Sequence, residues 1–211
     1  MLPAMVNLNA QPRQVEDVKA NSILNSLTRK SKTYKSFKAG FTIVMYGRDK
    51  KPTDTQKGSL LVKGAKYKLD IKNQTVICDS STVWTYLKDA NEVQINNVDP
   101  KSKNAITPDN IFTIYKKGFK KHYEGESKQG NTIMETVDLY PIHPEKEKYH
   151  TLKFVINKEK NQIAEIKVMM KDGTMVYYII NTFATNINLP ADTFSFNKKN
   201  YPDVEVEDLR D

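Results

Sequence analysis

The residues that could carry out chemistry are few in this chain and lie far apart. The three histidines are His122, His143 and His150, and their spacing matches no common metal-binding motif. The only cysteine, Cys78, excludes an internal disulfide bond and any site built from several cysteines. It ends the apolar run Val76–Cys78, a setting typical of a small buried residue. We therefore expect neither a metal ion nor a cofactor.

Short catalytic motifs are missing as well. The sequence has no GxSxG, no HExxH and no glycine-rich phosphate loop, and it contains 8 glycines in all. Its carboxylates are dispersed among lysines, as on a solvated surface. A nucleophile and a base from distant parts of the chain stay open at this point. The sequence favours a protein that is not an enzyme.

A formal net charge of +8 raises the question of an anionic partner. Of the 33 basic residues, however, the only arginines are Arg13, Arg29, Arg48 and Arg210. Arginine provides the rigid fork that reads phosphates and base edges, whereas scattered lysines often protect a β-surface. We therefore expect no nucleic-acid partner. A basic β-protein that binds an anionic polymer or a membrane surface through lysines remains an alternative.

Two segments have the apolar periodicity of helices. The first spans Val15 to Ser31, with Leu24 and Leu27 on its apolar face. The second begins at Thr107-Pro108, a typical helix start, and its apolar residues include Ile111, Phe112, Ile114 and Tyr115. No run of 18 apolar residues exists, so we expect contact with membranes to be peripheral only.

Most other segments alternate apolar and polar residues with the period of two that is typical of β-strands. Phe41, Ile43 and Met45 share one face of the segment FKAGFTIVMYG. Gly40 within it suggests a bulge, and Asp172-Gly173 is a strong hairpin signal. Tyr67, Leu69 and Ile71 alternate with Lys66, Lys68 and Asp70, and further strands are predicted through Ile77, through Trp84, through Val93–Ile95, and over Lys120–Glu126, Thr132–Tyr140, His150–Asn157, Ile163–Met170 and Thr174–Phe183.

These elements predict a mainly β (α+β) fold: a single curved antiparallel sheet of about ten or eleven strands with helices against its apolar face. We expect one monomeric domain over residues 15–206 and a tail over 207–211. Residues 1–14 are expected to be a residual signal or disordered N-terminus, because MLPAMVNLNA, Met1 to Ala10, resembles the end of a secretory signal peptide.

Four stretches in order resemble the outer-membrane lipoprotein carrier family, the LolA-type proteins. They are YKSFKAGFTIVM, KGSLLVKGAKYKLDI, ICDSSTVWTYLKDANEVQI and NINLPADTFSFNKKNYPDVEV. They correspond to the family's first strand, its Gly-x-Leu hairpin, its Leu-Trp-x-Tyr stretch and its Phe-x-Phe ending. The resemblance covers nearly all of residues 15–206.

The resemblance implies an incomplete β-barrel whose apolar cavity is covered by a helical lid. It implies a periplasmic chaperone that binds the acyl chains of lipoproteins and shuttles them from the inner to the outer membrane. Its partners would be acylated lipoproteins, an inner-membrane lipoprotein-releasing ABC transporter and an outer-membrane acceptor. The cavity wall would contain Phe41, Ile43, Met45, Tyr67, Leu69, Ile71 and Trp84, and the lid would contain Leu24, Leu27, Ile111, Phe112 and Tyr115. Met45, Met134, Met169 and Met170 suit a cavity that adapts to different chains.

The sequence departs from the family pattern at two turns. The Arg-Pro pair that follows the hairpin lysine in many carriers, and is associated with latching the lid, is replaced here by Gly64-Ala65 after Lys63. Lys63 and Lys66 are the candidate substitutes. Asp79-Ser80-Ser81 replaces an Asp-Gly turn. An alternative with the same fold is a periplasmic lipid-sensing regulator, although such proteins usually carry a further C-terminal domain.

Overall fold

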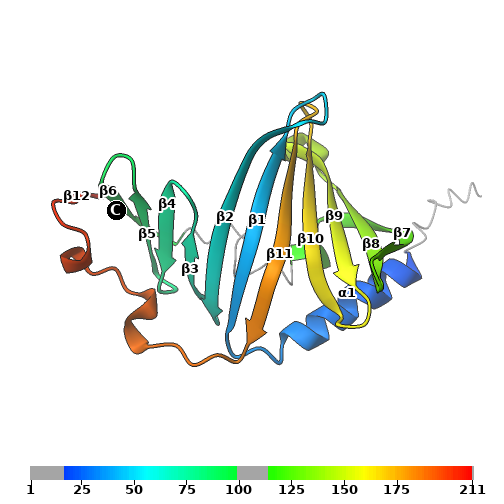
Figure 1. Cartoon of the computed structure of the whole chain (residues 1–211), viewed down its shortest axis with the longest axis horizontal. Helices are drawn as coiled ribbons and strands as arrows, with labels where there is room; N and C mark the ends of the chain where they lie inside the picture. The colour runs from blue at the N-terminus through cyan, green and yellow to red at the C-terminus, as the bar shows by residue number, and fades with distance from the viewer. Residues whose placement is uncertain (1–16, 99–113, 211) are drawn as a thin grey trace, which may run out of the picture.

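The computed structural model describes residues 17–98 and 114–210. In these residues one α-helix, α1 (Val18–Ser31), accompanies a sheet of twelve strands (Figure 1). The strands are β1 (Phe37–Tyr46), β2 (Pro52–Lys63), β3 (Lys66–Asp70), β4 (Gln74–Cys78), β5 (Thr82–Leu87), β6 (Glu92–Asn97), β7 (Phe119–Gln129), β8 (Thr132–Pro141), β9 (Tyr149–Asn157), β10 (Gln162–Met170), β11 (Met175–Thr185) and β12 (Glu205–Asp208). Short 3₁₀ helices are η2 (Ile114–Lys116), η3 (Pro144–Lys146), η4 (Ala191–Phe194) and η5 (Lys198–Asn200).

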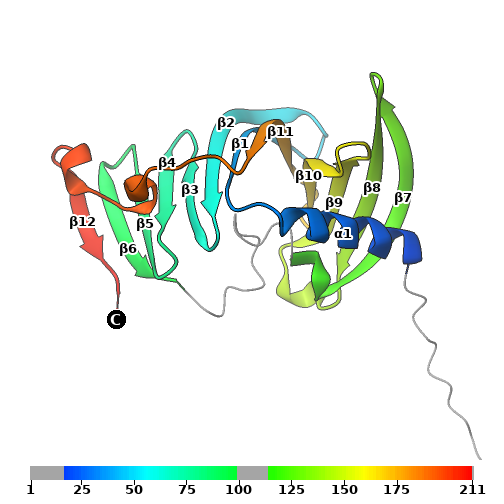
Figure 2. The ribbon, with the colours of Figure 1, turned by 90° about the horizontal axis from the view of Figure 1, so that it is seen from below.

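The sheet is open, with β12 and β7 at its two edges. Its strand order is β12-β6-β5-β4-β3-β2-β1-β11-β10-β9-β8-β7. All neighbouring pairs are antiparallel except β12 and β6. The sheet twists and curves strongly along its length, as Figures 1 and 2 show. The predicted curved antiparallel sheet is confirmed.

The strand register divides the sheet into two faces. We call the face that carries Phe41 and Ile43 the inner face, and the opposite face the outer face. Phe41 pairs with Ile180 and Ile43 with Tyr178 on β11, so the inner face continues across that strand. Tyr178 pairs with Ile166 on β10, and Ile166 pairs with Phe154 on β9, so the inner face also includes these two strands.

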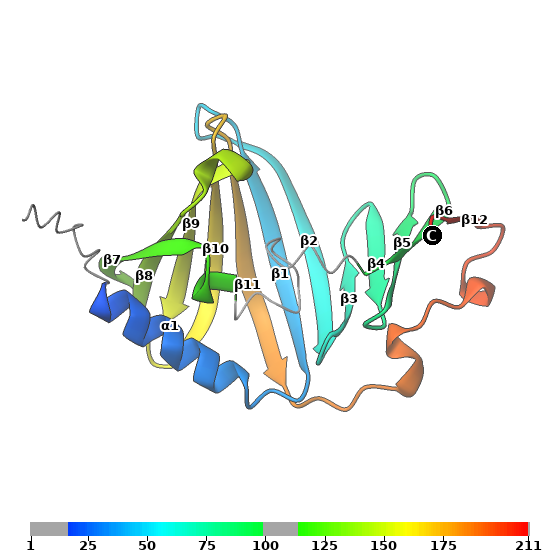
Figure 3. The same cartoon turned by 180° about the vertical axis from the view of Figure 1, so that it is seen from behind.

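Helix α1 covers the inner face over β7 to β11 (Figure 3). The side chain of Asp17 accepts a hydrogen bond from the backbone N–H of Ala20 at 2.9 Å and so caps the first turn. The helix therefore begins at Val18, three residues later than the periodicity predicted. Its buried side packs on the sheet and forms the main core with Val137, Leu139, Leu152, Phe154, Ile156, Ile166 and Val168.

The outer face of β3 to β6 is covered by the C-terminal segment, residues 191–204, which Figure 1 shows crossing beside these strands. Tyr86 of β5 meets the Tyr201 ring edge-on at a centroid distance of 4.7 Å. Phe194 and Val204 of this segment are buried. After it, β12 pairs with β6 in parallel, with Val206 opposite Val93, a pairing that the sequence did not predict.

Several local predictions are confirmed. The register of the β1–β11 ladder shifts between Gly40 and Phe41, which is the predicted bulge. Asp172-Gly173 connects β10 to β11, and Gly173 has the positive φ of 87° that this turn requires. Of the four apolar residues named for the predicted second helix, Ile114 and Tyr115 are among the described residues, where they belong to the 3₁₀ helix η2.

Candidate functional site

Six of the seven residues predicted to form a cavity wall lie together on the inner face. Phe41 pairs with Gly58 on β2, and Gly58 shares its face with Leu60, which pairs with Leu69 on β3. A Cβ atom on Gly58 would lie 2.5 Å from Cζ of Phe41 and 2.9 Å from Cγ2 of Ile71. The ring of Phe41 and the methyl group of Ile71 therefore meet directly over this glycine.

The packing of these residues loosens along the face. Phe41 and Ile43 are buried, Tyr67, Leu69 and Ile71 are half-buried, and Met45 is 37% exposed. The same face continues over β4 and β5 through the half-buried Val76, Val83 and Leu87 and the buried Cys78. The inner face over β1 to β5 is thus an apolar surface on which several side chains are partly exposed to solvent. We call it the β1–β5 inner wall.

The register separates Trp84 from this wall. Val76 on the inner face pairs with Thr85, so the adjacent Trp84 points to the outer face, where it pairs with Ile77 and Ile95. That face is the one covered by the C-terminal segment. Every side chain from Thr82 to Leu87 except the buried Thr82 is half-buried, so exposure does not distinguish the two faces of β5.

The predicted lid residues that the structure describes come together over β8 to β10. Leu24, Leu27 and Tyr115 are each 2% exposed or less and belong to the main core. The rings of Tyr115 and Phe154 meet edge-to-face at 5.6 Å. Ile111 and Phe112 lie outside the described residues.

Tyr115 joins η2 to α1 through its hydroxyl group. This hydroxyl donates a hydrogen bond to the carbonyl oxygen of Leu24 at 3.2 Å and lies 3.0 Å from Oγ1 of Thr28. Burial raises the pKa of Tyr115 to about 12 because an ionised phenolate would be poorly solvated there. The neutral hydroxyl is therefore the form that fits this site.

Polar contacts fix α1 to the sheet at both ends. At its start, the Asp17 carboxylate also accepts a hydrogen bond from the backbone N–H of Tyr123 at 2.6 Å, and the two backbone bonds lower the pKa of Asp17. In its third turn, Ser26 accepts a hydrogen bond from Nδ2 of Asn161 at 2.9 Å, and near its end Lys30 donates from Nζ to the carbonyl oxygen of Lys160. In the first turn, Lys19 pairs with the buried Glu135 at 3.1 Å. The helix is held on β7, β8 and the β9–β10 turn.

The remaining residues singled out in the sequence are dispersed. Lys63 and Lys66 flank the exposed β2–β3 turn. Met134 and Met169 point to the outer face, whereas Met170 packs against the main core, so only Met45 of the four methionines lies on the β1–β5 inner wall. Within residues 17–98 and 114–210, no three histidine, cysteine or carboxylate side chains gather as metal ligands.

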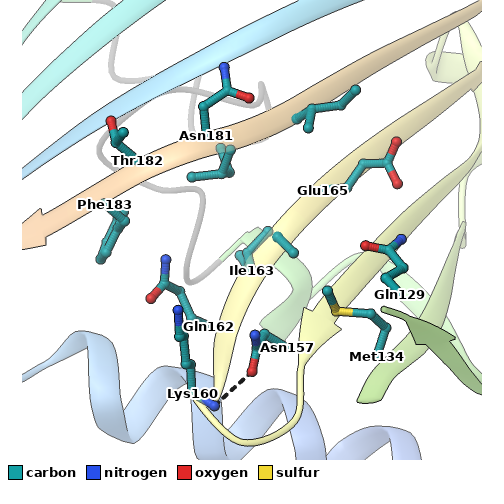
Figure 4. A pocket seen from close by; sticks show the side chains of 13 residues that line it. Gln129, Met134, Asn157, Lys160, Gln162, Ile163, Glu165, Asn181, Thr182 and Phe183 are labelled. Atoms are coloured by element: carbon teal, nitrogen blue, oxygen red, sulfur yellow. Dashed lines mark hydrogen bonds between the residues drawn. The ribbon is translucent and has the colours of Figure 1, made fainter. Parts of the chain in front are cut away.

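Two clefts are found in the described part of the chain, and of the residues predicted for a cavity only Met134 lines one of them, the larger. The larger, of about 520 Å³, lies between β10 and β11 (Figure 4). The smaller, of about 320 Å³, lies on the outer face between β2–β4 and the C-terminal segment. The β1–β5 inner wall is thus a surface rather than one of these clefts.

Comparison with known families decides the relationship of the chain. The model of the outer membrane lipoprotein carrier protein LolA matches residues 32–197. The chain belongs to the LolA family. A search of curated protein sequences finds no match.

Solved structures share the LolA-type fold of this chain. An uncharacterised protein from Thermus thermophilus matches with a TM-score of 0.61 and 11% identity, over 90% of this chain and 99% of that chain. The Mycobacterium tuberculosis lipoprotein LppX matches with a TM-score of 0.51 and 8% identity, over 83% of this chain and all of that chain. At these identities the likeness shows the fold alone.

A search of the described residues for a membrane-spanning helix, one of sufficient length and apolar character, finds none.

Proposed function

We propose that this LolA-family protein is an exported, non-enzymatic carrier that shelters the acyl chains of lipoproteins against its β1–β5 inner wall. The observation that carries the proposal is the contrast between the two halves of one face. Over β7 to β11 the inner face is filled by α1. Over β1 to β5, by contrast, Tyr67, Leu69 and Ile71 are only half-buried and Met45 is exposed, beside buried residues of the same face such as Val62 and Cys78. Membership of the family supports a hydrocarbon ligand for the exposed half.

The energetics fit a carrier that binds part of an acyl anchor and releases it. Each methylene group removed from water contributes about 0.8 kcal/mol, so a chain of about 15 methylenes fully covered would contribute roughly 12 kcal/mol. A half-exposed wall covers only part of the chain. The resulting intermediate affinity would suit transfer from an inner-membrane releasing transporter to an outer-membrane acceptor.

The proposed wall consists of Phe41, Ile43, Met45, Tyr67, Leu69 and Ile71, and the proposed lid of α1 with η2. Trp84 is left out because it lies on the other face. Met45, 37% exposed at the end of the wall, is a flexible side chain that can adapt to a hydrocarbon.

A matched pair of variants tests the proposal. Leu69 and Leu61 are half-buried leucines on neighbouring strands, but Leu69 lies on the inner wall and Leu61, which pairs with Lys68, on the outer face. Leu69→Glu should weaken binding of a palmitoylated peptide at least tenfold, because a carboxylate would be desolvated against hydrocarbon. Leu61→Glu should leave the affinity unchanged. Equal losses in both variants would refute the assignment of the wall.

The salt dependence of the same binding distinguishes the alternative of an anionic surface. Hydrocarbon held on an apolar wall should bind with nearly the same affinity at low and high salt. Binding that falls steeply with salt would instead identify contacts through the lysines.

A further inference from the structure

The sheet splits between β10 and β11. The ladder between these strands runs only from Glu165 opposite Ile179 to Met169 opposite Met175. Beyond Glu165, β10 continues to Gln162 while paired with β9 alone, and β11 continues to Thr185 while paired with β1 alone. Two strand edges therefore face each other across a gap without pairing.

Two bulges lie where the strands separate. On β11, Asn181 is an extra residue, because Gly40 pairs with Thr182 but Phe41 with Ile180. On β10, Ala164 is an extra residue within the ladder to β9. A bulge bends its strand and increases the local twist. Because each of the two strands carries a bulge at this point, the bulges account for the divergence of β10 and β11.

A cleft of about 520 Å³ occupies this split (Figure 4). Its polar lining is dominated by side-chain amides, and Figure 4 shows Gln129, Asn157 and Gln162 on one side and Asn181 on the other. The charged residues in its lining are one cation, Lys160, and one anion, Glu165. The size is within the usual range of ligand-binding clefts.

The amides are already oriented by neighbouring groups. Asn157 accepts a hydrogen bond on Oδ1 from the backbone N–H of Lys160 at 2.8 Å, and its Nδ2 group can donate to a ligand. Asn181 donates from Nδ2 to Oγ1 of Thr42 at 2.8 Å, and its Oδ1 can accept a hydrogen bond from a ligand. A donor from one side and an acceptor from the other match the C=O and N–H of a peptide group.

This chemistry selects among possible occupants. A hydrocarbon chain would bury several amides without partners, at a cost of about 1–3 kcal/mol each. An anion would face Glu165 as well as Lys160. An extended, uncharged polar peptide would satisfy the amides and could pair with the strand edges, as in binding by strand addition.

The cleft is connected to the proposed acyl-binding wall through one aromatic ring. Phe183 lines the cleft and stacks on Phe37 at a centroid distance of 5.3 Å. Phe37 lies on β1 four residues before Phe41 and on the same inner face. An acyl chain on the wall and the polypeptide attached to it could thus occupy both places at once.

We propose that the split between β10 and β11 binds, as an added strand, the extended polar segment that follows the acylated residue of a lipoprotein. The identity of this segment rests on the proposed carrier function; the preference for an extended polar peptide rests on the cleft itself. The partner supplies backbone N–H and C=O groups to the edges at Gln162–Ala164 and Ile180–Thr182.

Two synthetic probes separate peptide binding from acyl binding. The short probe is palmitoyl-glycine amide, and the long probe adds six residues of serine, threonine and asparagine. The long probe should bind about tenfold more tightly, which is what one or two net hydrogen bonds provide. A long probe with prolines, which lack the N–H donor, should lose this advantage.

A blocking variant and its control locate the effect. Gln162→Trp places an indole in the cleft, and Thr55→Trp places the same group on the exposed outer face of β2. Gln162→Trp should reduce the ratio of the two affinities to about one without changing the affinity for the short probe. Thr55→Trp should preserve the ratio. An affinity ratio of one in the wild type, or a ratio that Gln162→Trp leaves unchanged, would overturn the proposal.

Failure of the carrier function would be visible separately, because the short probe would then not bind. In that case hydrogen–deuterium exchange with the non-acylated peptide at millimolar concentration decides the question. Slower exchange confined to Ile163, Ala164 and Ile180–Thr182 supports a peptide site in the split, and unchanged exchange there refutes it.

Discussion

Replacement of Gly58 by alanine tests how tightly the base of the inner wall is packed. The new Cβ atom would lie 2.5 and 2.6 Å from two carbons of the Phe41 ring and 2.9 Å from a methyl group of Ile71. Carbon atoms prefer about 3.5–4.0 Å, so the ring would have to move by roughly 1 Å. Overpacking of this kind costs about 1–3 kcal/mol, and the lower entropy of the unfolded alanine chain returns about 0.4–1 kcal/mol. We expect a net loss of about 1–2 kcal/mol in the free energy of unfolding.

A double-mutant cycle isolates the contact. Phe41→Leu removes the carbons that meet the new Cβ atom, so Gly58→Ala should cost at least about 1 kcal/mol less in that background. Ile43→Val, on the same strand and face, serves as the control background and should leave the cost of Gly58→Ala unchanged. The measurement is urea unfolding followed by Trp84 fluorescence. Additivity of Gly58→Ala with Phe41→Leu, within about 0.5 kcal/mol, would refute the packing described for the wall.

Three further predictions concern the turns and the helix. Ser80 has a φ of 90°, so Ser80→Gly should relieve strain and raise the free energy of unfolding by about 1 kcal/mol in urea titrations, whereas a loss would contradict the turn geometry. The pKa of Tyr115 in the folded protein is raised to about 12, so the wild type should lose roughly 2–3 kcal/mol of its free energy of unfolding as pH rises from 10 to 12. Tyr115→Phe should remove this part of the loss. Parallel curves of unfolding free energy against pH for the two proteins would contradict the raised pKa. Asp17→Asn retains one acceptor oxygen for two backbone donors, the N–H groups of Ala20 and Tyr123, and should lower the free energy of unfolding by about 1 kcal/mol. Thermal unfolding measures the loss, and an unchanged transition temperature would exclude the double contact.

Much of the fold could be predicted because its signals are local. The alternation of Phe41, Ile43 and Met45 fixes which residues share a face, whatever the strand pairs with. Gly40 marked the bulge in β1, and Asp172-Gly173 marked the hairpin. The expectation of ten or eleven strands fell short by the terminal strand β12, because its parallel pairing with β6 joins segments more than a hundred residues apart.

The placement of Trp84 shows where periodicity stops being informative. Both faces of β5 are apolar, with Val83 on one and Trp84 on the other, so the sequence of this strand is compatible with either orientation. The register through Ile77 and Thr85 is what assigns Trp84 to the outer face. Which face of β5 looks inward is a property of the sheet rather than of the strand.

The split between β10 and β11 had no signal in the sequence. Its bulged residues are Ala164 and Asn181, neither of which is the glycine that marks many bulges. Each bulge is defined only by the register of its strand against a neighbour. The cleft that the two create therefore emerges from tertiary pairing.

The position of bound hydrocarbon tests the central claim most directly. Trp84 is the only tryptophan and lies on the outer face, whereas Tyr67 lies on the inner wall. Brominated palmitoyl chains quench tryptophan on contact. They should leave Trp84 fluorescence in the wild type unchanged, but quench the indole of the Tyr67→Trp, Trp84→Phe double variant. Quenching of Trp84 without quenching at position 67 would contradict an acyl-binding inner wall.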